Sequence, residues 1–158
     1  VMLIIGKEYC KLDSNGRFKL PIAIKRQLEA EDCRFVIKAS LFSPCLELWT
    51  YASFEEEMAR LKSRLNHYSI EDRKLLRKFS EGNIIEMDSN DRLVIPSEQK
   101  AVLQSSGKDL VLQSVGDWIE IWDYDMYQKE TDSTTTDYAG QANTRLGGTE
   151  QDCKNEEL

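Results

Sequence analysis

The 158-residue sequence is poor in the residues that build metal and catalytic sites. It contains one histidine, His67, and four cysteines, of which no two form a Cys-x-x-Cys pair. Zinc ligands usually come in such close pairs, and a serine or cysteine nucleophile needs histidine and carboxylate companions. The sequence therefore predicts no metal site and no cofactor, and an enzyme is the least favoured of the functions considered below.

Two further absences concern the cellular setting. The cysteines, Cys10, Cys33, Cys45 and Cys153, do not form the compact framework that is typical of small disulfide-bonded secreted domains. No apolar run approaches the ~20 residues that a helix needs to span a bilayer. We therefore expect a cytoplasmic protein that does not associate with membranes.

Positive charge is also scarce. The formal net charge is −7, of which residues 131–158 contribute −4 through six acidic and two basic residues. This balance argues against general binding of polyanions. Near the start, however, six basic residues lie within 20 positions: Lys7, Lys11, Arg17, Lys19, Lys25 and Arg26. Because local potential governs docking to phosphates, this cluster keeps a nucleic-acid partner open.

What the sequence does contain is a tandem duplication. Residues 12–21, LDSNGRFKLP, return 75 positions later as residues 87–96, MDSNDRLVIP, and Lys25 and Leu28 find counterparts in Lys100 and Leu103. The segment LELW at 46–49 matches IEIW at 119–122, at an offset of 73. Two copies predict a pseudo-symmetric pair, not a solenoid. Each copy of roughly 50 residues is marginal alone, so the copies should share a core, exchange elements or rely on neighbouring subunits.

In the first copy, apolar and β-branched runs predict strands over 3–12, 17–20, 35–37 and 46–49, and a short basic helix over 23–28. Asn15-Gly16 favours a type I′ hairpin between the first two strands, since both central residues of that turn need positive φ. The second copy repeats the plan, with strands expected at 83–88, 92–95, 110–115 and 118–122 and helices at 97–104 and 123–129. Beyond residue 130, Thr and Gly clusters without an apolar period predict disorder.

Two helices are expected between the copies. Ser53 and Glu56 fit a capping box at the start of the first helix, and Ser69 can cap the second. Phe54, Met58, Leu61 and Leu65 fall on one helical face, which predicts core packing. His67, between the helices, is expected to be a cap or surface residue.

The repeated turn carries the strongest chemical signal. Asp13-Ser14-Asn15-Gly16-Arg17 would hold Arg17 outward, where its planar guanidinium suits a phosphate or a guanine edge. Asp13 could pin that guanidinium or cap the turn, and Ser14 and Asn15 offer short donors to phosphate oxygens. The alternative is an Asp–Arg salt bridge that only fixes the turn.

The Asp-x-x-Gly-Arg-x-x-x-Pro pattern, doubled and joined by helices, resembles the MraZ family, the two-repeat members of the SpoVT/AbrB superfamily. The resemblance covers about residues 3–130. It implies an α+β, β-rich fold in which two AbrB-like repeats form a double-split (swapped-hairpin) β-barrel with linking helices. The domains would be a first repeat (3–52), linking helices (53–82), a second repeat (83–130) and a disordered acidic tail (131–158).

The same resemblance implies function. Members form ring-like oligomers on repeated double-stranded DNA sites and repress the division and cell-wall gene cluster, which places them at the nucleoid. Arg17 and Arg92 would contact DNA. The full set of expected DNA-binding residues is Arg17, Arg92, Ser14, Asn15, Lys19 and Asn90. The expected turn-supporting residues are Asp13, Gly16 and Asp88.

Two departures from the family pattern modify this expectation. Asn15 and Asn90 stand where the family commonly has lysine, and Asp91 replaces the glycine of the second copy. Aspartate tolerates a left-handed turn, but its charge beside Arg92 would repel phosphate. We therefore expect Arg17→Ala to weaken DNA binding more than Arg92→Ala.

A second function remains open. If Asn15, Asn90, Asp91 and the acidic balance weaken DNA binding, the protein would be an oligomeric assembly protein on the same fold.

The tryptophans and the strand edges concern packing. Trp49 and Trp122 could stack on bases, but their equivalent positions beside apolar strand residues favour packing in a core or subunit interface. Marginal repeats and exposed strand edges predict an oligomer larger than a dimer.

Overall fold

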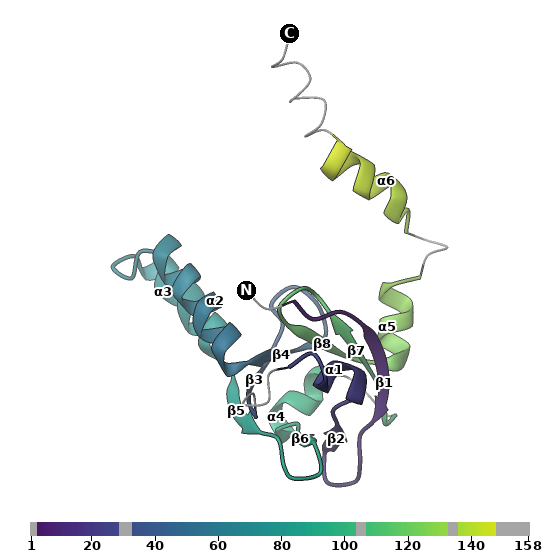
Figure 1. Ribbon diagram of the computed structural model, residues 1–158. Coiled ribbons are helices and arrows are strands. Elements are labelled where there is room, and N and C mark those ends of the chain that lie inside the picture. The colour runs from purple at the N-terminus through teal and green to yellow at the C-terminus, as the bar shows by residue number, and fades with distance from the viewer. Residues whose placement is uncertain (1–2, 29–32, 104–106, 133–135, 148–158) are drawn as a thin grey trace. The chain divides into compact units, whose positions relative to one another are not determined.

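The computed structural model describes residues 3–28, 33–103, 107–132 and 136–147 (Figure 1). The chain divides into two compact units, Val1–Met126 and Tyr127–Leu158. Both copies of the repeated turn lie in the first unit.

The first unit is built on two antiparallel sheets. Its strands are β1 (Lys7–Lys11), β2 (Arg17–Lys19), β3 (Arg34–Ala39), β4 (Leu46–Thr50), β5 (Asn83–Glu86), β6 (Arg92–Val94), β7 (Asp109–Ser114) and β8 (Ile119–Asp123). Six of them form a sheet in the order β1-β7-β8-β4-β3-β5, and β2 pairs with β6 in a two-stranded ribbon. The fold is therefore of mixed α and β composition with antiparallel strands. Because the described pairs make two separate sheets, the double-split barrel implied by the resemblance is not confirmed.

The strand order is symmetric with respect to the duplication. Replacing each strand by its counterpart in the other copy turns β1-β7-β8-β4-β3-β5 into the same order read backwards. Among the described strands, only β3–β4 and β7–β8 pair within a copy. The pairs β1–β7, β3–β5, β4–β8 and β2–β6 all form across copies. The predicted hairpin of residues 3–12 with 17–20 is thus wrong, since β1 and β2 each find their partner in the other copy.

One core serves both copies. Alternation along β4 turns Leu46 and Leu48 inward, and β8 does the same with Ile119 and Ile121. The β2–β6 ribbon adds Phe18 and Leu93, which are register partners and almost fully buried. Each such side chain contributes about 1.5–3 kcal/mol of burial free energy. The cluster draws on both sheets and both copies, which overcomes the marginal size of each repeat.

Short helices follow each ribbon strand. The helix α1 (Ile22–Lys25) begins after Pro21, and α4 (Ser97–Lys100) begins after Pro96 and continues into a 3-10 turn, Ala101–Leu103. Proline suits such helix starts because its φ is already helical and a first-turn N–H needs no partner. Ile24 and Leu103 are buried and fix these segments against the core.

Two longer helices join the copies, α2 (Tyr51–Arg64) and α3 (Ile70–Ser80). Ser69 accepts a hydrogen bond from Asp72 N at 3.4 Å, which confirms its predicted capping role. The predicted Ser53 cap is wrong, because α2 begins two residues earlier. There Thr50 Oγ1 accepts a hydrogen bond from Ser53 N at 3.2 Å, and Ser53 is buried in the first turn.

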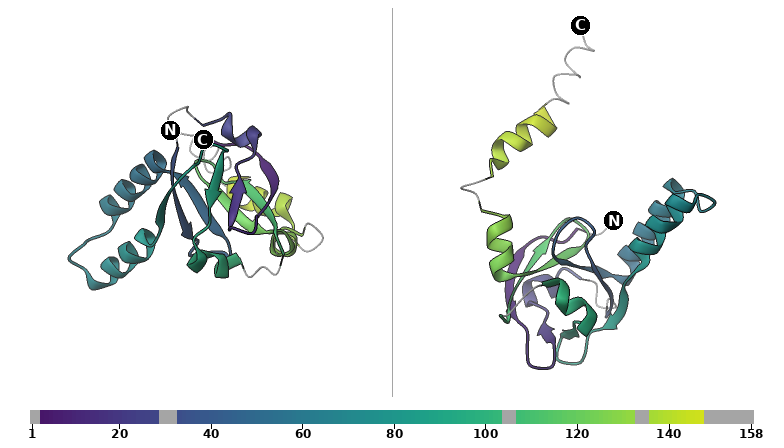
Figure 2. Two further views of the ribbon diagram at one scale, coloured as in Figure 1. Left: turned by 90° about the horizontal axis from the view of Figure 1, so that it is seen from below. Right: turned by 180° about the vertical axis from the view of Figure 1, so that it is seen from behind.

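The apolar stripe of α2 does not enter the core as predicted. Phe54, Met58, Leu61 and Leu65 are only half-buried, and α3 has no buried residue. Figure 2 shows the reason, since α2 and α3 leave the sheets together as an antiparallel pair. The two helices therefore extend away from the core side by side, which leaves the apolar stripe of α2 only half-covered.

Three helical segments complete the description: α5 (Tyr124–Glu130), α6 (Tyr138–Ala142) and a π-helical turn, Asn143–Gly147. The last two lie where composition predicts a disordered tail. Asp137 Oδ1 caps α6 by accepting a hydrogen bond from Gly140 N at 3.0 Å. The remaining tail residues, 133–135 and 148–158, are outside the described residues.

Candidate nucleic-acid interface

The two copies of the turn lie next to each other beyond the β2–β6 ribbon (Figure 1). We call residues 13–17 tip 1 and residues 88–92 tip 2. Pairing of Arg17 with Val94 and of Lys19 with Arg92 in the ribbon register sets the two tips side by side. The exchange of strands therefore unites two motifs that are 75 residues apart in sequence.

Each tip is built around its aspartate. Asp13 Oδ1 accepts hydrogen bonds from Asn15 N and Arg17 N, both at 2.9 Å, and Gly16 N donates to Asp13 O at 3.1 Å. Asp88 Oδ1 accepts the equivalent bonds from Asn90 N at 2.8 Å and Arg92 N at 3.0 Å. The aspartate side chain thus organises each turn locally, in an Asx-type arrangement.

Only one residue of each tip needs the left-handed conformation. Gly16 has φ +75° and Asp91 has φ +62°, and among the described residues Asp91 is the one non-glycine with positive φ. Asn15 has no positive φ, so the predicted type I′ turn is wrong. The carbonyl oxygens of Gly16 and Asp91 accept hydrogen bonds from Ile95 N and Leu20 N, each at 2.8 Å. Each tip is therefore bonded to the other copy.

The arginines are exchanged between the tips. Arg17 Nη1 lies 3.3 Å from Asp88 Oδ2, and Arg92 Nη1 lies 3.5 Å from Asp13 Oδ2. In both aspartates one oxygen serves its own turn and the other faces the opposite arginine. Both arginine side chains are 49% exposed. The Asp–Arg alternative raised by the sequence is present, but between copies and not within one.

The hydrogen bonds of the turns hold both carboxyl groups in the charged form. The backbone N–H of Arg17 lowers the pKa of Asp13, with smaller contributions from Asn15 N–H and from the charges of Arg92 and Arg17. For Asp88, the N–H of Arg92 lowers the pKa most, followed by Asn90 N–H and the same two guanidinium charges. The aspartates are therefore anionic at neutral pH and orient the arginines.

Asp91, the residue before Arg92, forms an ion pair with a lysine of the first copy. Its Oδ1 accepts a hydrogen bond from Lys25 Nζ at 2.7 Å, and this ion pair links tip 2 to the end of α1. The Asp91 carboxylate is therefore paired with Lys25, and the Arg92 guanidinium faces Asp13. Sequence reasoning paired Lys25 with Lys100 as repeat counterparts but did not place either at a tip.

The other predicted contacts surround the arginines. Ser14, Asn15, Lys19 and Asn90 are all exposed. Lys19 lies on β2 directly across from Arg92. Hydroxyl, amide and ammonium groups therefore surround a pair of half-exposed guanidinium groups, which is the donor chemistry that phosphate oxygens and base edges accept.

Trp49 and Trp122 lie on the face of the large sheet that points away from the shared core, because they alternate with the core residues Leu48 and Ile121. Trp49 and Trp122 are each 4% exposed, which confirms the predicted packing role. Their Nε1 atoms donate to Glu47 Oε1 and Glu120 Oε1, both at 3.1 Å. Burial raises the pKa of Glu47. These side chains are unavailable for stacking on bases.

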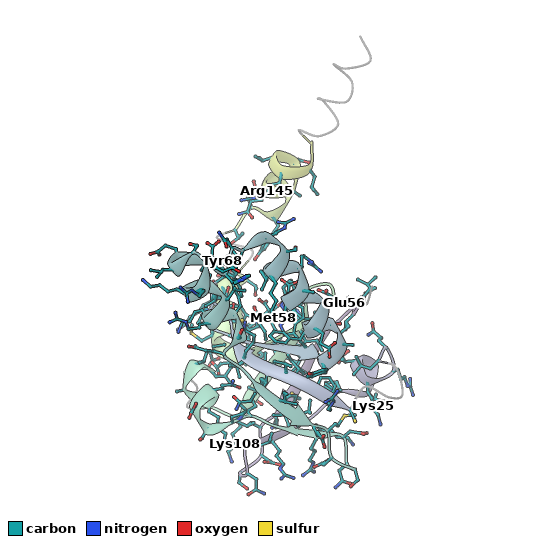
Figure 3. The ribbon with its side chains drawn as sticks, turned by 90° about the vertical axis from the view of Figure 1, so that its left-hand side faces the viewer. Lys25, Glu56, Met58, Tyr68, Lys108 and Arg145 are labelled. Carbon is teal, nitrogen blue, oxygen red and sulfur yellow. The ribbon has the colours of Figure 1, made fainter. Side chains whose placement is uncertain are left out.

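Two grooves flank the sheet at its outer strands, and sequence analysis identified neither. One, of about 490 Å³, lies between α2 and β5 and is lined in part by Phe54, Met58 and Ile84. Figure 3 shows Met58 near the sheet end of the helical pair, with Tyr68 at the far turn. Ile84 is 60% exposed on the outer strand β5. Periodicity could not reveal this groove because an edge strand forms one of its walls.

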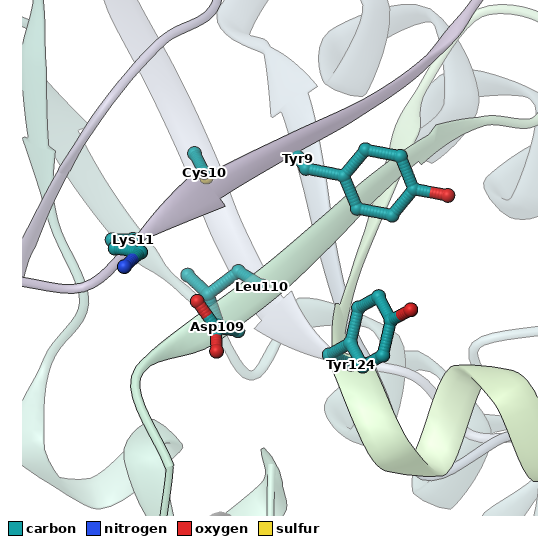
Figure 4. Close-up of a pocket in the computed structure, with 6 residues that line it drawn as sticks. All are labelled: Tyr9, Cys10, Lys11, Asp109, Leu110 and Tyr124. Carbon is teal, nitrogen blue, oxygen red and sulfur yellow. The ribbon is translucent and has the colours of Figure 1, made fainter.

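The second groove, of about 320 Å³, lies beside β1 and is lined by Tyr9, Cys10, Lys11, Asp109, Leu110 and Tyr124 (Figure 4). The Tyr9 and Tyr124 ring centroids are 5.9 Å apart, and their hydroxyl groups point to the same side. Burial raises the pKa of Cys10 to about 12, so its thiol is not a nucleophile at neutral pH.

Other site types are not found in the part of the chain that the structure describes. No three His, Cys, Asp or Glu residues gather there in a way that could hold a metal ion. None of its helices combines the length and apolar character needed to cross a bilayer.

Comparison with known proteins gives a consistent result. No family model matches the chain. It is 38% identical over 151 residues to a protein of Flavobacterium psychrophilum named Transcriptional regulator MraZ, covering 94% of this chain and 95% of that protein. Proteins of the same name from Christiangramia forsetii and Cytophaga hutchinsonii are each 34% identical. They cover 94% and 93% of this chain and 96% and 97% of their own lengths. Similarity of this extent, together with the doubled Asp–Arg tips, shows that the chain belongs to the MraZ family.

Proposed function

We propose that this chain is a sequence-specific DNA-binding transcriptional regulator that acts as a repressor. The observation that supports this most is the pairing of two half-exposed arginines at adjacent tips, each held by an aspartate of the other copy. The name carried by its relatives, transcriptional regulator, points to the same function.

The geometry suggests how the tips engage DNA. A guanidinium has five N–H donors in a planar fork. The ion pair with aspartate occupies Nη1 of each arginine, so the remaining donors can reach a phosphate or a guanine edge. Because the aspartates restrict the arginines beforehand, binding loses less side-chain entropy. Ser14, Asn15, Lys19 and Asn90 would add contacts to the DNA backbone.

We further propose that the protein works as an oligomer larger than a dimer, in the form of a ring. The outer strands β1 and β5 have one sheet neighbour each, and an apolar groove lies beside each of them. Unpaired edges with apolar grooves favour association. A ring would present many tip pairs to repeated DNA sites, and simultaneous binding raises the effective concentration.

In this proposal the repeats, 3–52 and 83–130, supply one composite tip pair per subunit, and residues 53–82 link them. The sites would lie upstream of the division and cell-wall gene cluster, and the protein would be cytoplasmic and nucleoid-associated. The family resemblance supports these points.

A mobility-shift assay tests the DNA-binding function. The probe is DNA from upstream of the operon that encodes the protein, and the competitor is the same fragment with shuffled sequence. We expect a specific shift that Arg17→Ala weakens by about 10- to 100-fold, the effect of losing 1–3 kcal/mol. Arg77→Ala, which removes an exposed arginine from α3, is the control and should bind normally. No specific shift at low salt would refute the proposal.

The second candidate is an assembly protein on the same fold. The two grooves and the net charge of −7 favour it. It predicts a stable oligomer by light scattering together with no specific DNA shift. A monomer at micromolar concentration would contradict both the ring and the assembly function.

A further inference from the structure

The two lysines that end the short helices reach the tips. Lys25 closes α1 and Lys100 closes α4, at equivalent positions of the duplication. Lys25 Nζ bonds Asp91 of tip 2. Lys100 Nζ lies against Gly16 of tip 1, so closely that a β-carbon added to Gly16 would collide with it. Each lysine therefore meets the left-handed residue of the opposite copy's tip.

The partners of these lysines differ in one respect. Asp91 offers a carboxylate, and its ion pair with Lys25 occupies that ammonium group. Gly16 has no side chain. Within the described part of the chain, no ion pair or side-chain hydrogen bond is formed by Lys100. The ammonium group of Lys100 occupies the space that a β-carbon at Gly16 would fill, and it keeps its capacity to bind an anion.

The balance of charges at the two tips also identifies Lys100 as a cation without an acidic partner among the described residues. Asp88 and Asp13 face Arg17 and Arg92, and Asp91 faces Lys25. Two lysines without an acidic partner remain among these residues. Lys100 lies at tip 1 and Lys19, across from Arg92, lies at tip 2. Each tip with its lysines then carries a net charge of +1, although the chain as a whole carries −7.

We propose that Lys100 binds a backbone phosphate of DNA at tip 1 and that Asp91 keeps Lys25 from making the equivalent contact at tip 2. This inference rests on the proposed DNA-binding function. Lysine suits the role because its ammonium is a compact, strongly hydrated charge that attracts phosphate without fixing an orientation. Asp91 is then a residue that sets how many phosphates the tip pair neutralises.

The salt dependence of DNA binding tests this directly, since each phosphate contact contributes about 0.9 to the slope of log affinity against log salt concentration. Lys100→Gln should lower the slope by about 0.9 for each engaged subunit. Between 50 and 200 mM salt, this changes the loss of affinity by about threefold. Asp91→Gly should release Lys25 and raise the slope by a similar amount.

The double variant Asp91→Gly/Lys25→Gln is the matched control. It removes both members of the ion pair and should return the slope to that of the unmodified protein. Glycine suits position 91 because φ there is positive, and thermal unfolding of each variant checks that the fold is kept.

The outcomes separate the inference from the proposed function. If Lys100→Gln leaves the slope unchanged while Arg17→Ala still weakens the specific shift, the inference fails and DNA binding stands. If the slope falls with Lys100→Gln but does not rise with Asp91→Gly, the role of Asp91 is wrong. If the unmodified protein gives no specific shift, both proposals fail.

Discussion

Tip 1 and tip 2 have the same backbone arrangement but reach it with different residues. Both are capped by an aspartate, and both send an arginine to the other tip. The left-handed residue is glycine in one and aspartate in the other. The added negative charge of Asp91 is matched by Lys25. Lys19 of the first copy lies across from Arg92, and its counterpart in the second copy is the uncharged Val94. A substitution that looks damaging in sequence is thus offset by neighbours from the other copy.

The largest expected effect concerns the core beneath the tips. Phe18 and Leu93 are equivalent positions and register partners at the centre of the ribbon. We expect Phe18→Ala to lower the free energy of unfolding by about 3–5 kcal/mol and Leu93→Ala by about 2–5 kcal/mol. Chemical denaturation measures both. A cost below 1 kcal/mol for either would show that the two copies do not share this core equally.

The next effect compares the arginines. Because Asp91 pairs with Lys25 and not with Arg92, we now expect Arg17→Ala and Arg92→Ala to weaken specific DNA binding to a similar degree, by about 1–3 kcal/mol each. This replaces the unequal losses expected from the sequence. Titration of labelled DNA gives both affinities, and a tenfold difference between the variants would restore the original expectation.

A smaller effect should distinguish the left-handed residues. Gly16→Ala places a β-carbon at φ +75° and against Lys100 Nζ. We expect a loss of about 1–2 kcal/mol in unfolding free energy, the cost of a left-handed conformation for a non-glycine residue. Asp91→Gly is the complementary change and should cost less, since it relieves backbone strain while breaking one part-buried ion pair. Thermal unfolding measures both variants, and a smaller loss of stability for Gly16→Ala than for Asp91→Gly would contradict this prediction.

The smallest expected effect is on pH dependence. The pKa values of Asp13 and Asp88 are lowered in the folded protein, first by the backbone N–H of Arg17 and of Arg92 respectively. A lowered folded pKa means that the stabilising contribution is fully present above the unfolded value, about 3.9. It is lost as the pH falls through the folded pKa. Carboxyl NMR titration should find both groups titrating below 3.9, and a value at or above it for either would show that its turn is not capped.

Local patterns predicted many of the elements. The predicted strands at 35–37, 46–49 and 118–122 follow from apolar runs, and the Ser69 cap follows from a single side chain. Both signals act within a few residues. The Ser53 cap failed because Thr50, three residues earlier, offers an equivalent hydroxyl. The core role of the α2 stripe failed because amphipathic spacing shows which face is apolar but not what covers it.

The sequence by itself determined the duplication, the aspartate and arginine of each turn, and membership of the MraZ family, since these depend on residue identity and spacing. Only the tertiary structure decided that β1 and β2 pair with the other copy, that each arginine meets the opposite aspartate, and that Asp91 is matched by Lys25. The physical reason is that strand pairing and ion pairing depend on distance in space. Residues 66 to 106 positions apart come together here because the two copies fold around one core.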